Sequence, residues 1–146
     1  MVHVNDVIIR DSDAFDTNGG AFEIVDSTLN ISGSHLAGNS AEKSCGAIAI
    51  SASSKMSSSL DVYHVIIGSN DAGRDGGGIA VSGPTRLTTE RLTMTRNLAN
   101  LYGGAVSIHG KDSYWSDIAS KISSNSAPAL YIIDDAIVNL SQHNSH

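Results

Sequence analysis

A short segment recurs along the chain, in which a pair of small residues is followed by Ala or Gly and then by alternating apolar residues. It occurs at residues 19–24, 45–50, 76–81 and 103–108, and in degenerate form at 128–132. Successive copies are 24 to 31 residues apart. A repeat in the twenties is typical of solenoids, because one coil cannot bury its apolar side alone and must stack on its neighbours.

An apolar residue, two spacers and an asparagine precede each copy: Phe15 with Asn18, Leu36 with Asn39, Ile67 with Asn70, Met94 with Asn97, and Ile122 with Asn125. In the three central copies the asparagine lies six residues before the small pair. We expect Asn39, Asn70, Asn97 and Asn125, with Asn18 as a further candidate, to stack as an internal ladder, because buried turns need hydrogen-bond partners. An exposed row of amides that binds a ligand is the alternative, and the small Ala flanking these positions favours the ladder.

Between the copies lie short runs with period-two alternation, at residues 29–31, 60–62, 65–67, 92–94, 118–122 and 137–140. Such runs bounded by Gly, Ser, Asn and Asp predict β-strands, two or three in each coil, and no stretch has a helical apolar period. The prediction is an all-β, single-stranded, right-handed parallel β-helix of about five coils. It forms one domain over 1–146, with 1–14 as an N-terminal edge segment and 141–146 as a frayed tail.

Side-chain alternation assigns one set of residues of the repeated strand to the interior. They are Phe22, Ile24, Ile48, Ile50, Ile79, Val81, Val106, Ile108, Leu130 and Ile132.

The two signatures of the repeat resemble a known family. The first reads Gly-Gly-Ala-Phe, Cys-Gly-Ala-Ile, Gly-Gly-Gly-Ile and Gly-Gly-Ala-Val, and the second is a literal Phe-x-x-Asn at Phe15 to Asn18. Gly-Gly-Ala-Ile with Phe-x-x-Asn is similar to the repeat of the chlamydial polymorphic outer membrane proteins, and the resemblance covers residues 15–132. It implies a β-helix that serves as a cell-surface adhesin or autotransporter passenger, and hence a secreted or surface location.

Charge and composition exclude several classes of function. The net charge is −6 and the nine Lys and Arg residues are scattered, so we expect no nucleic-acid partner and no attraction to anionic lipid. The single Cys45 excludes an internal disulfide and a multi-cysteine metal site, and we expect it to be buried and inert. The N-terminus shows no signal-peptide pattern, and no apolar stretch is long enough to span a bilayer.

One cluster of charged residues could carry chemistry. Asp71, Arg74 and Asp75 share one turn, and Glu42 and Lys43 occupy the matching place one coil earlier. Carboxylates and bases on adjacent coils could perform acid–base work on a polysaccharide, or could bind calcium as a cofactor. Solvated turn charges are the ordinary explanation, because the next coil has no charge there. No other metal site is predicted.

The outward side of the repeated strand is small and nearly uncharged. The predicted binding face consists of Ala47, Ala49, Gly78, Ala80, Ala105, Ser107 and Tyr131. Such a face is either covered or offered to a partner. The favoured hypothesis is a non-catalytic interaction module that binds a protein, a glycan or a second copy there. The alternative is a carbohydrate-active lyase or hydrolase, or its remnant, that uses the charged cluster. Ice binding ranks lowest, because Thr88, Thr93 and Thr95 fall within one coil and do not recur.

Overall fold

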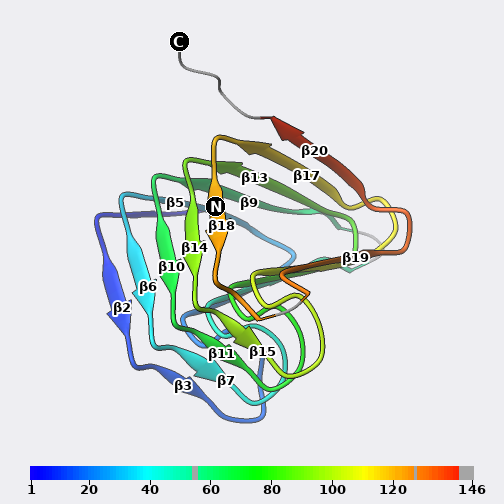
Figure 1. The fold of residues 1–146 in the computed structure, drawn as a ribbon. Coiled ribbons are helices and arrows are strands. Elements are labelled where there is room, and N and C mark those ends of the chain that lie inside the picture. Colours follow the sequence, from blue (N-terminus) through cyan, green and yellow to red (C-terminus); the bar gives the residue numbers. More distant parts are fainter. Residues whose placement is uncertain (54–55, 127, 142–146) are drawn as a thin grey trace.

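The computed structural model describes residues 1–53, 56–126 and 128–141. These residues form a parallel β-helix of about five coils without any helix, as predicted (Figure 1). Residues 142–146 of the predicted tail, Ala127 and part of the serine-rich turn lie outside the described residues. Ser141, predicted as the first residue of the tail, instead ends a strand and pairs with Ile118. The predicted edge segment 1–14 contains the first strands of three of the four sheets.

Four parallel sheets run along the stack, and each of the first four coils contributes one strand to each sheet. Sheet A contains β1 (Val2–Asn5), β5 (Thr28–Ser32), β9 (Ser58–Tyr63), β13 (Thr85–Glu90), β17 (Tyr114–Ile118) and β20 (Ile137–Ser141). Sheet B contains β2 (Ile8–Arg10), β6 (His35–Ala37), β10 (Ile66–Gly68), β14 (Thr93–Thr95) and β18 (Lys121–Ser123). Sheet C contains β3 (Asp13–Ala14), β7 (Ser40–Ala41), β11 (Asp71–Ala72) and β15 (Leu98–Ala99). Sheet D contains β4 (Phe22–Val25), β8 (Ile48–Ser51), β12 (Ile79–Ser82), β16 (Val106–His109) and β19 (Leu130–Ile133).

The first four coils have four strands each, where the sequence predicted two or three. The strands of sheet C are only two residues long, too short to show alternation. The run 118–122, predicted as one strand, is divided between β17 and β18. Ala119 has a φ of 57° and turns the chain between them.

The repeated strand forms sheet D, and its predicted inward residues stack in register. Phe22, Ile48, Ile79, Val106 and Leu130 form one row of Cα partners. The three central members of this row are fully buried, and the two at the ends of the stack are half-buried. Identical positions on adjacent strands lie about 4.8 Å apart, so these side chains make one continuous aliphatic core.

The asparagine ladder is confirmed at four positions. The Nδ2 atoms of Asn39, Asn70 and Asn97 each donate to the Oδ1 atom of the next asparagine in the stack at 2.9 Å, ending at Asn125. The same Oδ1 atoms also accept the main-chain N–H groups of the preceding asparagines. The ladder therefore satisfies the buried polar groups of this corner in four successive coils.

Asn18 does not belong to the ladder. In the first coil Ile9 is the register partner of Leu36, and the main-chain N–H of Ser12 donates to Asn39 Oδ1 at 3.2 Å. Phe15, the literal match to the Phe-x-x-Asn signature, is 73% exposed. The structural equivalent of that signature in the first coil is therefore Ile9-x-x-Ser12.

Cys45 occupies a turn position that glycine fills in other coils. Its φ is 67°, and Gly76, one coil later, has a φ of 68°. The thiol is fully buried and lies 3.1 Å from the carbonyl oxygen of Gly78. Burial raises the pKa of the thiol from 9.0 to about 12, partly offset by main-chain hydrogen bonds.

This pKa predicts a stability loss in alkaline solution that the Cys45→Gly variant lacks. Between pH 9 and 12 the thiol ionises only in the unfolded chain, so the free energy of unfolding falls by about 1.4 kcal/mol per pH unit. Urea denaturation at pH 8 and pH 10 measures this loss in both proteins. We expect the wild type to lose about 1.4 kcal/mol more than Cys45→Gly, and equal losses would contradict the assignment.

Candidate functional site

The outer row of sheet D is built from small residues because the preceding turns fold back over it. Glu23, Ala49, Ala80, Ser107 and Tyr131 are successive register partners. A Cβ atom added to the turn residue Gly76 would lie 2.8 Å from the Cβ of Ala80, and one added to Gly103 would lie equally close to the Cβ of Ser107. Glycine is therefore required at these two turn positions, which pack directly against the outer row.

The predicted flat binding face is wrong in two respects. Ala47 and Ala105 belong to the buried core, and a Cβ added to Gly78 would contact the Met94 Cε atom inside the coil. At the start of β4, β12 and β16 one carbonyl accepts two successive N–H groups of the neighbouring coil, as Ala47 O does from residues 21 and 22. This double pairing interrupts the alternation, so two consecutive residues face inward. The remaining outer row is also partly covered by the turns.

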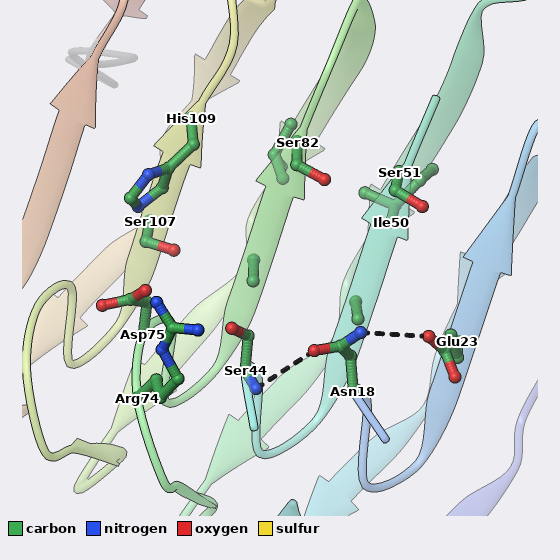
Figure 2. Close-up of a pocket in the computed structure, with 13 residues that line it drawn as sticks. Asn18, Glu23, Ser44, Ile50, Ser51, Arg74, Asp75, Ser82, Ser107 and His109 are labelled. Atoms are coloured by element: carbon green, nitrogen blue, oxygen red, sulfur yellow. Dashed lines mark hydrogen bonds between the residues drawn. The ribbon is translucent and has the colours of Figure 1, made fainter. Parts of the chain in front are cut away.

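Between the turns and the ends of the strands there is a hollow with a volume of about 180 Å³ (Figure 2). Its floor is formed by Ala49, Ala80 and Ser107. One wall consists of the turn residues Asn18, Ser44, Arg74 and Asp75, and the other of the strand-end residues Ser51, Ser82 and His109. The hollow therefore crosses β8, β12 and β16 along the direction of the stack.

Three buried polar atoms of residues around this hollow have no hydrogen-bond partner. They are Asp75 Oδ1, Ser107 Oγ and His109 Nε2, and they are three of the four such buried side-chain atoms among the described residues. Asp75 is only 8% exposed and Ser107 only 1%. Each unpaired buried polar group costs about 1–3 kcal/mol, so three of them beside one hollow mark it as the candidate site.

Side-chain contacts are found beyond the floor of the hollow at both ends of the stack. At one end Asn18 Nδ2 donates to Glu23 Oε1 at 3.2 Å, and Asn18 Oδ1 accepts the main-chain N–H of Ser44 at 3.2 Å (Figure 2). At the other end Tyr131 stacks on Tyr102, with ring centroids 4.2 Å apart and an interplanar angle of 13°. The hollow is therefore bounded along the stack as well as on its two sides.

The predicted catalytic cluster is only partly assembled. Arg74 and Asp75 line the hollow, whereas Asp71 is exposed on β11 in sheet C. Two of the five residues predicted for the catalytic cluster therefore line the hollow.

Glu42 and Lys43, the remaining residues of the predicted cluster, interact with the preceding coil. Glu42 Oε2 accepts the main-chain N–H of Asp16 at 3.0 Å, and Lys43 Nζ lies 3.0 Å from Asp16 Oδ1. These contacts are exposed and contribute little to stability. Glu42 and Lys43 are therefore solvent-exposed turn charges, which is the ordinary explanation of the predicted cluster.

Sequence reasoning missed His109 as a site residue. His109 is the register partner of Ser82, and Ser82 is the register partner of Ser51. Extending the predicted repeat strand by one residue would have included this row, which lies beside the hollow. The strand predicted from the sequence ends at its second inward aliphatic residue, Ile108, one position before His109.

No group of three or more His, Cys, Asp and Glu side chains in residues 1–53, 56–126 and 128–141 is arranged to hold a metal ion. The same residues contain no helix of the length and apolarity needed to cross a bilayer. No family model, curated protein or solved structure matches this chain.

Proposed function

We propose that this chain is a non-catalytic binding module and that its ligand is a glycan bound in the hollow over sheet D. The observation that carries the proposal is the convergence of Asp75 Oδ1, Ser107 Oγ and His109 Nε2, all unpaired, above a floor of small residues. A binding site that combines a small apolar floor with a few convergent polar groups is the usual form of a small-ligand site.

The chemistry of these groups suits a sugar. A carboxylate accepts hydrogen bonds, a serine hydroxyl both donates and accepts, and an imidazole does one or the other according to its tautomer. Sugar hydroxyls also both donate and accept, so one ring can satisfy all three. The hollow has a volume of about 180 Å³, well above the space that a single water needs.

The local shape favours a glycan over a protein or a second copy. A stable protein interface covers about 800 Å² on each partner. The turns at Gly76 and Gly103 cover part of the outer row of sheet D and leave a narrow hollow there. A narrow concave site admits a chain end or a small ring more readily than a flat protein surface.

A carbohydrate-active enzyme is the second candidate. Asp75 and His109 line one hollow, and both carry side chains that can transfer protons. Release of new reducing ends from a bound oligosaccharide, abolished in Asp75→Asn, would establish this activity in place of the binding module.

Asp75→Asn is expected to weaken glycan binding by about 10- to 100-fold, because a hydrogen bond to a charged group contributes about 1.5–3 kcal/mol. Binding is measured by titration calorimetry with neutral malto-, cello-, xylo- and chito-oligosaccharides of two to six units. Asp71→Asn, the same substitution outside the hollow on sheet C, is the matched control and should leave the affinity unchanged.

A second variant tests the same site from the opposite wall. Ser82 is an exposed wall residue, so Ser82→Arg should block the hollow without disturbing the core. Absence of binding to every oligosaccharide, or equal affinities of the wild type, Asp75→Asn and Ser82→Arg, would refute the proposed function.

A further inference from the structure

The hollow has the form of a groove that is closed at both ends. Its floor residues Ala49, Ala80 and Ser107 lie on three neighbouring strands, which at about 4.8 Å per strand span roughly 10 Å. A sugar chain that ran along this floor would have to leave over β4 at one end or over β19 at the other. The contacts at these two places therefore decide which part of a glycan can bind.

The end over β4 is closed by a polar bridge. Glu23 continues the floor row on β4, and its Oε1 atom accepts a hydrogen bond from Asn18 of the turn wall at 3.2 Å. Because Asn18 also accepts the main-chain N–H of Ser44, its side chain is held between Ser44 and Glu23 (Figure 2).

The end over β19 is closed by aromatic rings. Tyr131 continues the floor row beyond Ser107. Its ring stacks on Tyr102, which follows the turn wall, and lies with its centroid 5.3 Å from that of His109 in the opposite wall. The three rings reach from one wall to the other, and the unpaired polar atoms of Ser107 and His109 lie beside them.

We propose, on the basis of the proposed function, that the hollow recognises the terminal ring of a neutral glycan and not an internal stretch of the chain. The ring enters from the open side, its outer hydroxyls bond Asp75, Ser107 and His109, and the rest of the glycan extends into solvent. The opposite charges of Arg74 and Asp75 in the turn wall give no net preference for an ionic sugar.

Terminal recognition predicts how affinity depends on chain length. Each oligosaccharide of three to six units is compared with its own polysaccharide by calorimetry on the intact chain, both at the same concentration of sugar units. Affinity per chain should stay constant, so affinity per sugar unit should fall in proportion to chain length. Affinity per sugar unit that is independent of chain length would overturn terminal recognition and leave glycan binding intact.

Asn18→Ala tests the closure itself, since it removes the bridge to Glu23 without altering the floor. It should raise the affinity per sugar unit for the polysaccharide severalfold relative to the affinity for the matching trisaccharide. Asn100→Ala, at an exposed turn position outside the hollow, is the control. No gain with Asn18→Ala would contradict the closure, whereas failure of the wild type to bind any of these sugars would refute the proposed function as well.

Discussion

Replacing Asn70 with alanine is expected to lower the free energy of unfolding by about 4 kcal/mol, because each buried group left unpaired costs about 1–3 kcal/mol. Asn70 Nδ2 donates to Leu36 O and Gly68 O at 3.1 Å and to Asn97 Oδ1 at 2.9 Å. Its Oδ1 accepts the main-chain N–H of Asn39 at 3.0 Å and the Nδ2 of the same residue at 2.9 Å. Alanine removes both sets of partners at a position where the chain is buried.

Asn100→Ala is the matched control for this prediction, because Asn100 lies in an exposed turn one coil further along. Its loss should stay within about 0.5 kcal/mol, as for most surface substitutions. Urea denaturation followed by circular dichroism measures both. A loss below about 1 kcal/mol in Asn70→Ala would show that the corner is satisfied without the ladder.

Gly77→Ala is expected to destabilise the chain by about 3 kcal/mol, or to prevent folding, because overpacking against backbone cannot be relieved by a rotamer change. A Cβ atom on Gly77 would contact the carbonyl oxygen of Gly104 and lie 2.5 Å from that of Leu98. Both oxygens belong to the next coil, so the methyl group would separate two stacked coils. The φ of Gly77 is not in the left-handed region, so the effect is steric and not conformational.

Gly68→Ala supplies the comparison. Gly68, at the end of β10, is buried as Gly77 is, yet the nearest atom to an added Cβ is Thr95 O at 3.5 Å, an ordinary contact. The free energy of unfolding of Gly68→Ala should differ from the wild-type value by no more than about 1 kcal/mol. The added Cβ makes only ordinary contacts there, and alanine also restricts the unfolded chain. Thermal and urea unfolding of the two variants decide the matter, and equal losses would refute the steric explanation.

Both predictions concern the register on which the proposed site depends. The hollow exists because Ala49, Ala80 and Ser107 are aligned on adjacent strands and the turns beside them overlap at a constant position. A separation of the coils at Gly77 would displace Asp75 relative to Ser107. Glycan binding should therefore be lost in Gly77→Ala along with stability.

The first coil shows where pattern reasoning failed and why. The literal Phe15 and Asn18 match the signature by residue type, but the ladder uses Ser12 and the core uses Ile9. The spacing of six residues between asparagine and small pair, constant in the central copies, places the expected position at residue 13, next to Ser12. Spacing is a more reliable guide here than residue identity, because the stacked backbones impose it.

Strand β13 shows a second failure. Its sequence Thr-Arg-Leu-Thr-Thr-Glu contains one aliphatic residue, so no alternating apolar run is visible. Thr85 and Thr89 are nevertheless buried beside Leu87, and Trp115 Nε1 donates to Thr89 Oγ1 at 3.0 Å. A hydroxyl with an internal partner can take an apolar place in the core, and sequence alone does not reveal that partner.

The sequence by itself determined the stack: the repeat predicted a parallel β-helix of about five coils, the inward aliphatic rows and the ladder from Asn39 to Asn125. These features depend on local periodicity, which every coil repeats. Only the tertiary structure decided the shape of the outer face, where the turns fold over Ala80 and Ser107 and bring Asp75 and His109 to one hollow. That arrangement depends on how far each turn reaches over its neighbour, and residue spacing along a chain does not encode that distance.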